Sequence, residues 1–190
     1  MAAAVAVSPV VVTVPLRKSA DILRAEAARS VAGTASAQPA ASSRLSTDQG
    51  STASLQVLAL INRTRAGAGL PALTITPGLG ACAAAHNLRM ADGCGLSHQC
   101  PGEPPLSARE TAAGIVWTAA GENVGQGGPV SDTDSAIAEM VVSLTQAMIN
   151  ERPPDDGHRL NIMSSKFTRV GIAVYRDGSG TVWLTQDFAN

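Results

Sequence analysis

Two strand-like runs near the carboxy-terminal end constrain the fold of this chain more than any other feature. Residues 170–175 and 181–188 are rich in the β-branched and aromatic side chains that favour strands. Asp177, Gly178, Ser179 and Gly180 lie between them, and Asp-Gly between two such runs is a strong signal for a tight β-turn. The chain is therefore predicted to end in an antiparallel β-hairpin.

Three helical patterns precede the hairpin. The first covers residues 55–65, with Ser54 as its N-cap and with Gly67 and Gly69 just beyond its end. The helical period predicts one buried face, made of Leu55, Leu58, Ile61 and Arg65.

The second helical pattern begins at Thr76 and Pro77, since proline is favoured at the first position of a helix. Apolar spacing continues from there to Gly93. The predicted stripe comprises Leu79, Cys82, Ala83, His86 and Met90. His86 is therefore interpreted as a buried or half-buried histidine bonded to the backbone, rather than as a ligand.

The third pattern runs from a cap at Asp134 or Ser135 to Ile149. The pair Pro153-Pro154 then ends the helix, because neither residue can donate to the helical ladder. The segment between the second and third patterns is interpreted as rich in loops. Helices first and an antiparallel hairpin last predict an α+β fold.

The first part of the chain has a different character. Ala2 to Leu16 is apolar, but it is shorter than the roughly 20 residues of a membrane-spanning helix. It resembles an export leader with Ala35-Ser36-Ala37 as a cleavage site, or else a plain disordered tail. The composition of residues 30–53 predicts a flexible linker. We therefore expect a leader and linker over 1–53, a folded domain over 54–190, and no stable transmembrane helix.

Charge excludes two classes of partner. The chain has 14 Lys and Arg against 15 Asp and Glu, and after residue 50 nine basic residues face twelve acidic ones. Binding to nucleic acid or to an anionic membrane surface needs a clustered excess of basic residues. We expect neither kind of binding.

The short motifs of common catalytic sites do not occur in the sequence. The three histidines do not form HExxH, and there is no GxSxG elbow, Walker loop or full calcium loop. Several short islands remain, and they follow one another in a fixed order: 60–62 with Arg65, 96–98, 121–124, 148–151, 157–162 and 183–188.

In this order the islands resemble the CAP superfamily, also called the SCP or PR-1-like domain, and most closely its short bacterial secreted branch. The resemblance covers about residues 54–190. It implies a three-layer α-β-α sandwich with a central antiparallel sheet and a polar cleft. It also implies a cleft tetrad of two histidines and two glutamates, which in this sequence are His98, Glu122, Glu151 and His158.

Glu151 is the least regular member of this tetrad, and Glu139 is the competing candidate. Asn123, Arg159 and Asn161 are expected to support the cleft, since Asn bonds readily to nearby backbone. Arg159 is expected to pair with Asp155, Asp156 or a carboxylate of the cleft.

Two imidazoles and a carboxylate suit a divalent cation such as Zn²⁺, or Mg²⁺, with one coordination position left open. His98, Glu122 and His158 are the expected ligands. The alternative is a hydrogen-bonded polar cluster in which each histidine is held by a glutamate.

The three cysteines leave one unpaired. In an exported protein Cys94 and Cys100 are the best pair, since their disulfide closes a small loop around His98. Cys82 is then a free, buried thiol. Pairing of Cys82 with Cys94 is the alternative, and a cytosolic chain would keep all three as thiols.

Two functions of different class remain. The favoured one is a monomeric, secreted or cell-envelope binding module without enzyme activity, whose ligand is lipid-like, a cell-wall fragment or a protein; the resemblance implies these classes without choosing between them. The other is a metal-dependent peptidase or esterase with Glu122 as the base and His98 and His158 as ligands.

Overall fold

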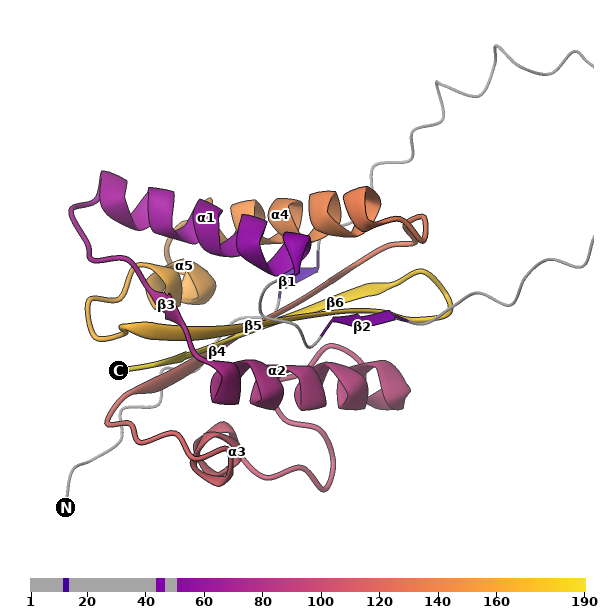
Figure 1. The fold of residues 1–190 in the computed structure, drawn as a ribbon, viewed down its shortest axis with the longest axis horizontal. Coiled ribbons are helices and arrows are strands. Elements are labelled where there is room, and N and C mark those ends of the chain that lie inside the picture. Colours follow the sequence, from indigo (N-terminus) through magenta and orange to yellow (C-terminus); the bar gives the residue numbers. More distant parts are fainter. Residues whose placement is uncertain (1–11, 14–43, 47–50) are drawn as a thin grey trace, which may run out of the picture.

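The computed structural model describes residues 12–13, 44–46 and 51–190, which form three layers. One face of the central sheet is covered by α1 (Thr52–Gly67), α4 (Asp134–Ile149) and α5 (Gly157–Ile162). The other face is covered by α2 (Pro77–Arg89) and α3 (Leu106–Ala112), as Figure 1 shows. The expected α-β-α sandwich is therefore confirmed.

Three long strands make the centre of the sheet. They are β4 (Ala120–Gly127), β5 (Arg169–Arg176) and β6 (Val182–Ala189), and β6 pairs antiparallel with both of the others. The predicted hairpin is β5–β6, and it is confirmed. The sheet order is β1-β4-β6-β5-β2, and the short strand β3 (Thr74–Ile75) also pairs with β5.

The predicted leader and most of the predicted linker lie outside the described residues. Two short segments of that part are described: β1 (Val12–Thr13), which pairs parallel with β4, and β2 (Arg44–Ser46), which pairs antiparallel with β5. None of the helices in the described residues is long and apolar enough to cross a membrane.

Two predicted helix starts were wrong. The cap of α1 is Ser51, whose hydroxyl accepts the Ser54 N–H, while Ser54 is buried inside the first turn. The cap of α4 is Thr133, whose hydroxyl accepts the Ala136 N–H. In both cases a second hydroxyl residue precedes the predicted cap, and side-chain capping selects the earlier one. Leu55, predicted to be buried, is 48% exposed.

The stripe predicted on α2 is correct. Leu79, Cys82, Ala83, His86 and Met90 are all buried. The segment continues into a short π-helical turn, η1 (Met90–Cys94), which ends at Gly95 with a positive φ of 75°. Its widened turn is closed by a hydrogen bond from the Gly95 N–H to the carbonyl of Met90 at 2.9 Å.

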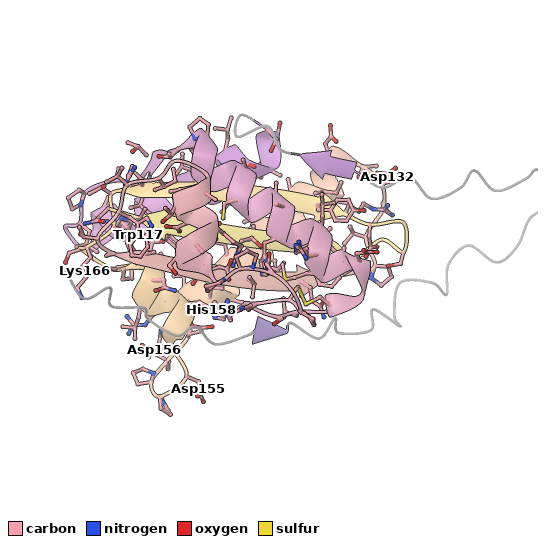
Figure 2. All side chains as sticks on the ribbon, turned by 90° about the horizontal axis from the view of Figure 1, so that it is seen from below. Trp117, Asp132, Asp155, Asp156, His158 and Lys166 are labelled. Atoms are coloured by element: carbon pink, nitrogen blue, oxygen red, sulfur yellow. A yellow bond between two sulfur atoms is a disulfide. The ribbon has the colours of Figure 1, made fainter. Side chains whose placement is uncertain are left out.

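The elements that were not predicted include α3, β4 and α5. In β4, Glu122 and Val124 face the α2 side, and Gly121, Gly125 and Gly127 face the opposite layer. A Cβ on Gly125 would meet Met148, and one on Gly127 would meet Met140, both on α4. The glycines therefore let α4 pack directly on the strand backbone. Figure 2 shows Trp117, before β4, and Asp132, after it, at opposite ends of the molecule.

Candidate functional site

The first part of the site is the loop that joins η1 to α3. Cys94 and Cys100 form a disulfide whose Cα atoms are 5.6 Å apart, and Cys82 is free and buried. The predicted pairing is confirmed, and the alternative of Cys82 with Cys94 is wrong. The disulfide closes the loop that carries His98.

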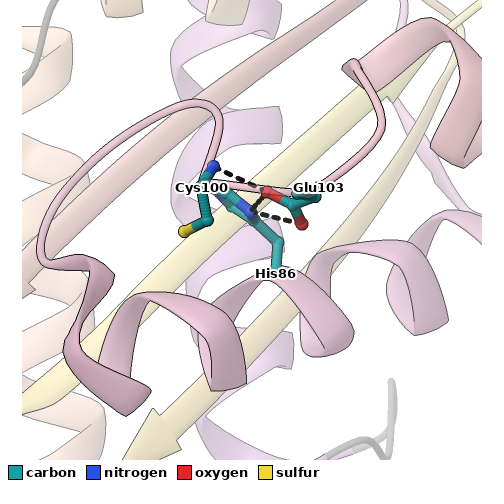
Figure 3. Close-up of side chains that lie close together, drawn as sticks. All are labelled: His86, Cys100 and Glu103. Carbon is teal, nitrogen blue, oxygen red and sulfur yellow. Dashed lines mark hydrogen bonds and ion pairs between the residues drawn. The ribbon is translucent and has the colours of Figure 1, made fainter.

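Beneath this loop lies a buried pair, His86 and Glu103 (Figure 3). His86 Nε2 lies 2.8 Å from the carbonyl oxygen of Ser97, which confirms the predicted backbone bond. His86 Nδ1 lies 3.0 and 2.9 Å from the two carboxyl oxygens of Glu103. Glu103 also accepts the Cys100 N–H at 3.0 Å. The loop is thus attached to α2 by the hydrogen bonds of His86 and to the end of η1 by the disulfide.

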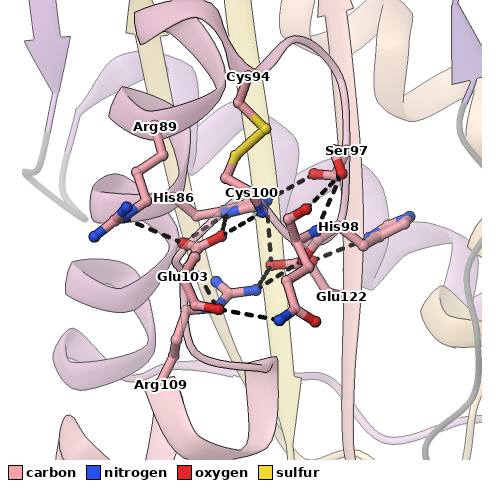
Figure 4. The surroundings of a disulfide bond; sticks show 10 residues. His86, Arg89, Cys94, Ser97, His98, Cys100, Glu103, Arg109 and Glu122 are labelled. Atoms are coloured by element: carbon pink, nitrogen blue, oxygen red, sulfur yellow. Dashed lines mark hydrogen bonds and ion pairs between the residues drawn. A yellow bond between two sulfur atoms is a disulfide. The ribbon is translucent and has the colours of Figure 1, made fainter.

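His98 pairs with Glu122 of β4 (Figure 4). His98 Nδ1 lies 3.0 Å from Glu122 Oε1, and Arg109 Nη2 donates to Glu122 Oε2 at 2.8 Å. Arg109 also donates to the carbonyl of His98 at 3.2 Å. Burial alone would raise the pKa of Glu122, but the His98 hydrogen bond and the Arg109 charge outweigh it and lower the pKa. Glu122 is therefore an ionised acceptor, and both of its oxygens are engaged.

His158 pairs with Glu151 at the start of α5. The Nδ1 of His158 lies 2.6 Å from Glu151 Oε1. Glu151 Oε2 accepts the backbone N–H groups of His158 and Arg159 at 3.0 and 3.2 Å, so the carboxylate caps the helix. Glu139 is exposed and lines a different groove on α4, so the competing candidate is not part of this site.

Two asparagines connect the two pairs. Asn161 Nδ2 donates to the carbonyl of Glu122 at 3.2 Å and to Asn123 Oδ1 at 2.9 Å. Asn123 Nδ2 donates to the carbonyl of His158 at 3.3 Å. Arg159 forms an ion pair with Asp156. The structure thus brings β4 and α5 together through Asn123 and Asn161, while Arg159 is turned to the acidic loop.

The structure leaves one ring nitrogen open on each histidine of the tetrad. The Nε2 atoms of His98 and His158 are buried and have no hydrogen-bond partner among the described residues. Burial lowers the pKa of His158, with the charge of His98 as a further cause and Glu151 opposing it. His158 is therefore neutral near pH 7, with its proton on Nδ1 and a lone pair on Nε2. Leaving a buried acceptor unpaired costs about 1–3 kcal/mol.

A further group offers metal ligands in principle. One ligand atom each from His86, Cys100 and Glu103 lie within 4.8 Å of one another. With Cys100 in a disulfide its sulfur is not a thiolate, so the oxidised chain does not present a complete donor set here.

Sequence reasoning missed two charged residues of this region, Glu103 and Arg109. Arg109 lies on α3 in a segment interpreted as loop, and it contacts both the carboxylate and the backbone of the His98–Glu122 pair. Glu103 lies between Pro101 and Pro104, and Arg109 lies between Pro105 and the Gly-Glu-Asn island at residues 121–123. Neither position belongs to a periodic apolar pattern that would predict its burial.

A buried carboxyl near the site predicts a dependence of stability on pH. Burial raises the pKa of Glu110 to about 8 from 4.5, and neither of its oxygens has a hydrogen-bond partner among the described residues. The folded state then holds a proton that the unfolded state releases, so stability falls as pH rises from about 4.5 to 8. Glu110→Gln is expected to flatten that fall and to be more stable than the parent at pH 8.

Urea unfolding across this pH range measures the effect. Glu139→Gln, an exposed matched control, is expected to leave the pH profile unchanged. Burial also raises the pKa of Asp187, and the charge of Glu110 adds to that rise, so the change in Glu110→Gln includes a smaller contribution from Asp187. Parallel profiles of the parent and Glu110→Gln would show that Glu110 does not retain its proton on folding.

A family match, a relative and solved structures all relate this chain to CAP or SCP domains or to their fold. Residues 58–188 match the family CAP, described as the cysteine-rich secretory protein family. The chain is 30% identical over 158 residues to the uncharacterized protein YkwD of Bacillus subtilis. That match covers 80% of this chain and 55% of the relative, so the chain spans about half of the relative's length.

Solved structures share the fold. An extracellular protein of Bacillus anthracis that contains an SCP domain has 26% identity and a TM-score of 0.56, over 72% of this chain and 39% of that one. An outer surface protein of Borrelia burgdorferi has 12% identity and a TM-score of 0.63, over 78% of this chain and 98% of that one. The second likeness concerns the fold alone.

Proposed function

We propose that this chain, which belongs to the CAP family of cysteine-rich secretory proteins, is an extracellular binding module. Its cleft holds a divalent cation between His98 and His158. The single observation that supports this proposal is the pair of buried, unpartnered Nε2 atoms. Each belongs to an imidazole whose other nitrogen faces a glutamate. A cation that accepts both lone pairs removes the cost of burying them unpaired.

The donor set favours zinc. Neutral imidazole nitrogen suits Zn²⁺, whereas Mg²⁺ prefers oxygen ligands. Histidines that bind metals commonly donate their other N–H to a carboxylate, which fixes the ring and raises its basicity. Glu122 and Glu151 have this relation to His98 and His158. Glu122, first expected as a third ligand, is in this proposal a positioning residue, because both of its oxygens are engaged.

The bound ion supplies a Lewis acid with open coordination positions, which an oxygen donor of a ligand can fill. The residues of this chain hold that site in shape. Arg109 fixes the carboxylate of Glu122, and Asn161 and Asn123 hold β4 at a set distance from α5. Lipid-like, cell-wall and protein ligands all offer suitable oxygen donors.

Binding is favoured over hydrolysis because the carboxylates are held by donors that stabilise their charged form. Glu122 accepts from His98 and Arg109, and Glu151 accepts from the ring and backbone of His158 and from the backbone of Arg159. A general base is most effective when its pKa lies near the working pH. Burial alone would raise the pKa of Glu122, but the His98 hydrogen bond and the Arg109 charge lower it, so Glu122 is a weak base for a peptidase or esterase.

Zinc titration of the purified, oxidised chain tests the proposal. Isothermal titration calorimetry is expected to show one site in the parent, and loss of that site in the His98→Ala, His158→Ala double variant. Glu122→Gln or Glu151→Gln is expected to weaken binding on the order of 10- to 100-fold, as loss of an orienting carboxylate does elsewhere.

Asp155→Ala is the matched control, since Asp155 is an exposed carboxylate three residues before His158. It is expected to leave zinc affinity unchanged. Zinc affinity that survives removal of both histidines would exclude the site, and the tetrad would then be a structural polar cluster.

Export is part of the proposed function. The neighbouring solved structures are described as extracellular or outer-surface proteins. We propose the same location for this chain, with residues 1–53 as leader and linker and residues 54–190 as the secreted domain. Recovery of the protein from culture supernatant, shortened at its amino terminus, is the expected result. Recovery of the full-length chain from cell lysate alone would contradict it.

A further inference from the structure

We propose a second, redox-dependent zinc site in this chain, formed by Cys94, Cys100, His86 and Glu103 when the disulfide is reduced. It is separate from the cleft site, because it uses neither His98 nor His158. The ligand class is a borderline divalent cation, Zn²⁺ or Co²⁺, held by two thiolates, one imidazole and one carboxylate.

The donor atoms are already close together. Atoms of His86, Cys100 and Glu103 that can bind a metal lie within 4.8 Å of one another, as Figure 3 shows for their side chains. The sulfur of Cys94 is bonded to that of Cys100 and therefore lies directly beside it (Figure 4). Tetrahedral zinc needs its two sulfurs about 3.8 Å apart. After reduction, metal binding therefore requires the sulfurs of Cys94 and Cys100 to move apart. This movement takes place next to Gly95, which has a positive φ of 75°.

The surroundings of His86 match those of a metal-bound histidine. Its Nε2 donates to the carbonyl oxygen of Ser97 at 2.8 Å, which leaves Nδ1 facing the carboxyl group of Glu103. A hydrogen bond from the far ring nitrogen to a backbone carbonyl is a recurrent feature of histidines that bind metals. Glu103 is held in a similar way, since one of its oxygens accepts the Cys100 N–H at 3.0 Å.

The oxidised chain holds a proton where the ion would lie. The partners of the two ring nitrogens of His86 are a carbonyl and a carboxyl group, and a carbonyl oxygen accepts only. The His86–Glu103 contact therefore contains a shared proton, whichever atom carries it. In the reduced chain a divalent cation can replace that proton, because two thiolates supply the additional negative charge.

The site is closed to bulk solvent but reachable. His86, Cys100 and Glu103 are buried, as is typical of structural zinc sites with four protein ligands. A groove of about 330 Å³, lined by Arg89, Asp92, Gly93, Pro101 and both disulfide cysteines, leads to the sulfurs. A small dithiol and a metal ion can approach along it.

The chemistry balances with one named co-reactant, a dithiol. The dithiol gives two electrons and two protons, the Sγ–Sγ bond of Cys94 and Cys100 breaks, two thiols form, and the dithiol becomes a disulfide. Zn²⁺ then displaces the two thiol protons and the proton shared by His86 and Glu103. Removal of the ion returns the three protons to the site, and the disulfide form of the co-reactant then takes back two electrons and two protons, which restores the Sγ–Sγ bond.

Cobalt titration of the full-length chain with His98→Ala and His158→Ala in place tests the inference, because the cleft site is then removed. The oxidised form is expected to bind no Co²⁺, and the reduced form to bind one equivalent with sulfur-to-cobalt charge-transfer absorption. Zn²⁺ is expected to displace it. Glu103→Gln removes a direct ligand and is expected to weaken binding by at least the roughly 10- to 100-fold that loss of a ligand's orienting partner costs.

Two variants separate this site from other thiol chemistry. Cys82→Ser removes the remaining thiol and is expected to change nothing, while Cys94→Ser with Cys100→Ser is expected to abolish the absorption. Circular dichroism of the reduced chain is recorded with and without Zn²⁺, and a native spectrum with zinc supports the site.

Equal cobalt binding in both redox forms, loss of binding on Cys82→Ser, or a reduced chain that stays unfolded with zinc would each overturn the inference. None of these results bears on the cleft site, which is tested in the oxidised chain.

Discussion

Gly171→Ala is expected to cause the largest loss of stability of any single change discussed for this protein. Gly171 lies on β5, where α2 packs directly against the strand backbone. A Cβ at this position would lie 2.2 Å from Gly80 N and 2.2 Å from the carbonyl carbon of Leu79. These are backbone atoms of a helix, so no side-chain rotation relieves the clash. The helix would have to move off the sheet, and we expect a loss of more than about 3 kcal/mol.

Such a loss is a large part of the total stability of a domain, which is about 5–15 kcal/mol. Expression in the soluble fraction and urea unfolding followed by circular dichroism measure it. Gly67→Ala is the matched control, because a Cβ there meets nothing within 4 Å at the end of α1; it is expected to be neutral or slightly stabilising. A soluble Gly171→Ala variant with the unfolding midpoint of the parent would contradict the direct packing of α2 on β5.

Arg65→Met is expected to have the second largest effect. Arg65 is fully buried on α1, and its guanidinium donates to backbone carbonyls rather than to a carboxylate. The acceptors are Pro71 at 2.8 Å, Ile162 at 2.7 Å, Ser164 at 2.9 Å and Phe167 at 3.3 Å. Burial lowers the pKa of this guanidinium. One side chain thus closes the loops that follow α1 and α5.

Methionine keeps the apolar stem but removes every donor, so several carbonyls lose their partner. Each stranded acceptor costs about 1–3 kcal/mol, and relaxation with water entry leaves an expected total of roughly 3–5 kcal/mol. Arg63→Met, an exposed change two residues earlier on the same helix, is expected to stay within about 0.5 kcal/mol of the parent. Denaturant unfolding of the two variants side by side gives the comparison, and equal midpoints would contradict this role of Arg65.

The sequence predicted those parts of the fold whose signal is local. The β5–β6 hairpin follows from the Asp177-Gly178 turn, and the buried stripe of α2 follows from the spacing of its apolar residues. The disulfide follows from the short spacing of Cys94 and Cys100. Helix starts were displaced where two hydroxyl residues compete for one cap, as Ser51 and Ser54 do.

The missed parts depend on tertiary structure. Strand β4 has the sequence AGENVGQG, which has low strand propensity. It is a strand because it pairs along its length with β6 and because its glycines admit α4. Glu103 and Arg109 gain their roles from burial beside His86 and Glu122, and no pattern in the sequence reveals that burial.

For the site, the sequence supplied the four residues through a family resemblance, and the structure adds how they are paired. It sets His98 against Glu122 and His158 against Glu151, with their Nε2 atoms unpartnered among the described residues. The proposed metal site depends on those two nitrogens more than on the carboxylates.

Anomalous diffraction from crystals of the oxidised chain grown with zinc tests this account most directly. Data collected on both sides of the zinc absorption edge locate the ion without reference to affinity. The expected result is one strong peak bonded to His98 Nε2 and His158 Nε2, at the roughly 2.0–2.1 Å typical of zinc and imidazole. A peak on the carboxylates of Glu122 and Glu151 alone, or no peak in the cleft at a zinc concentration that saturates the protein, would contradict the account.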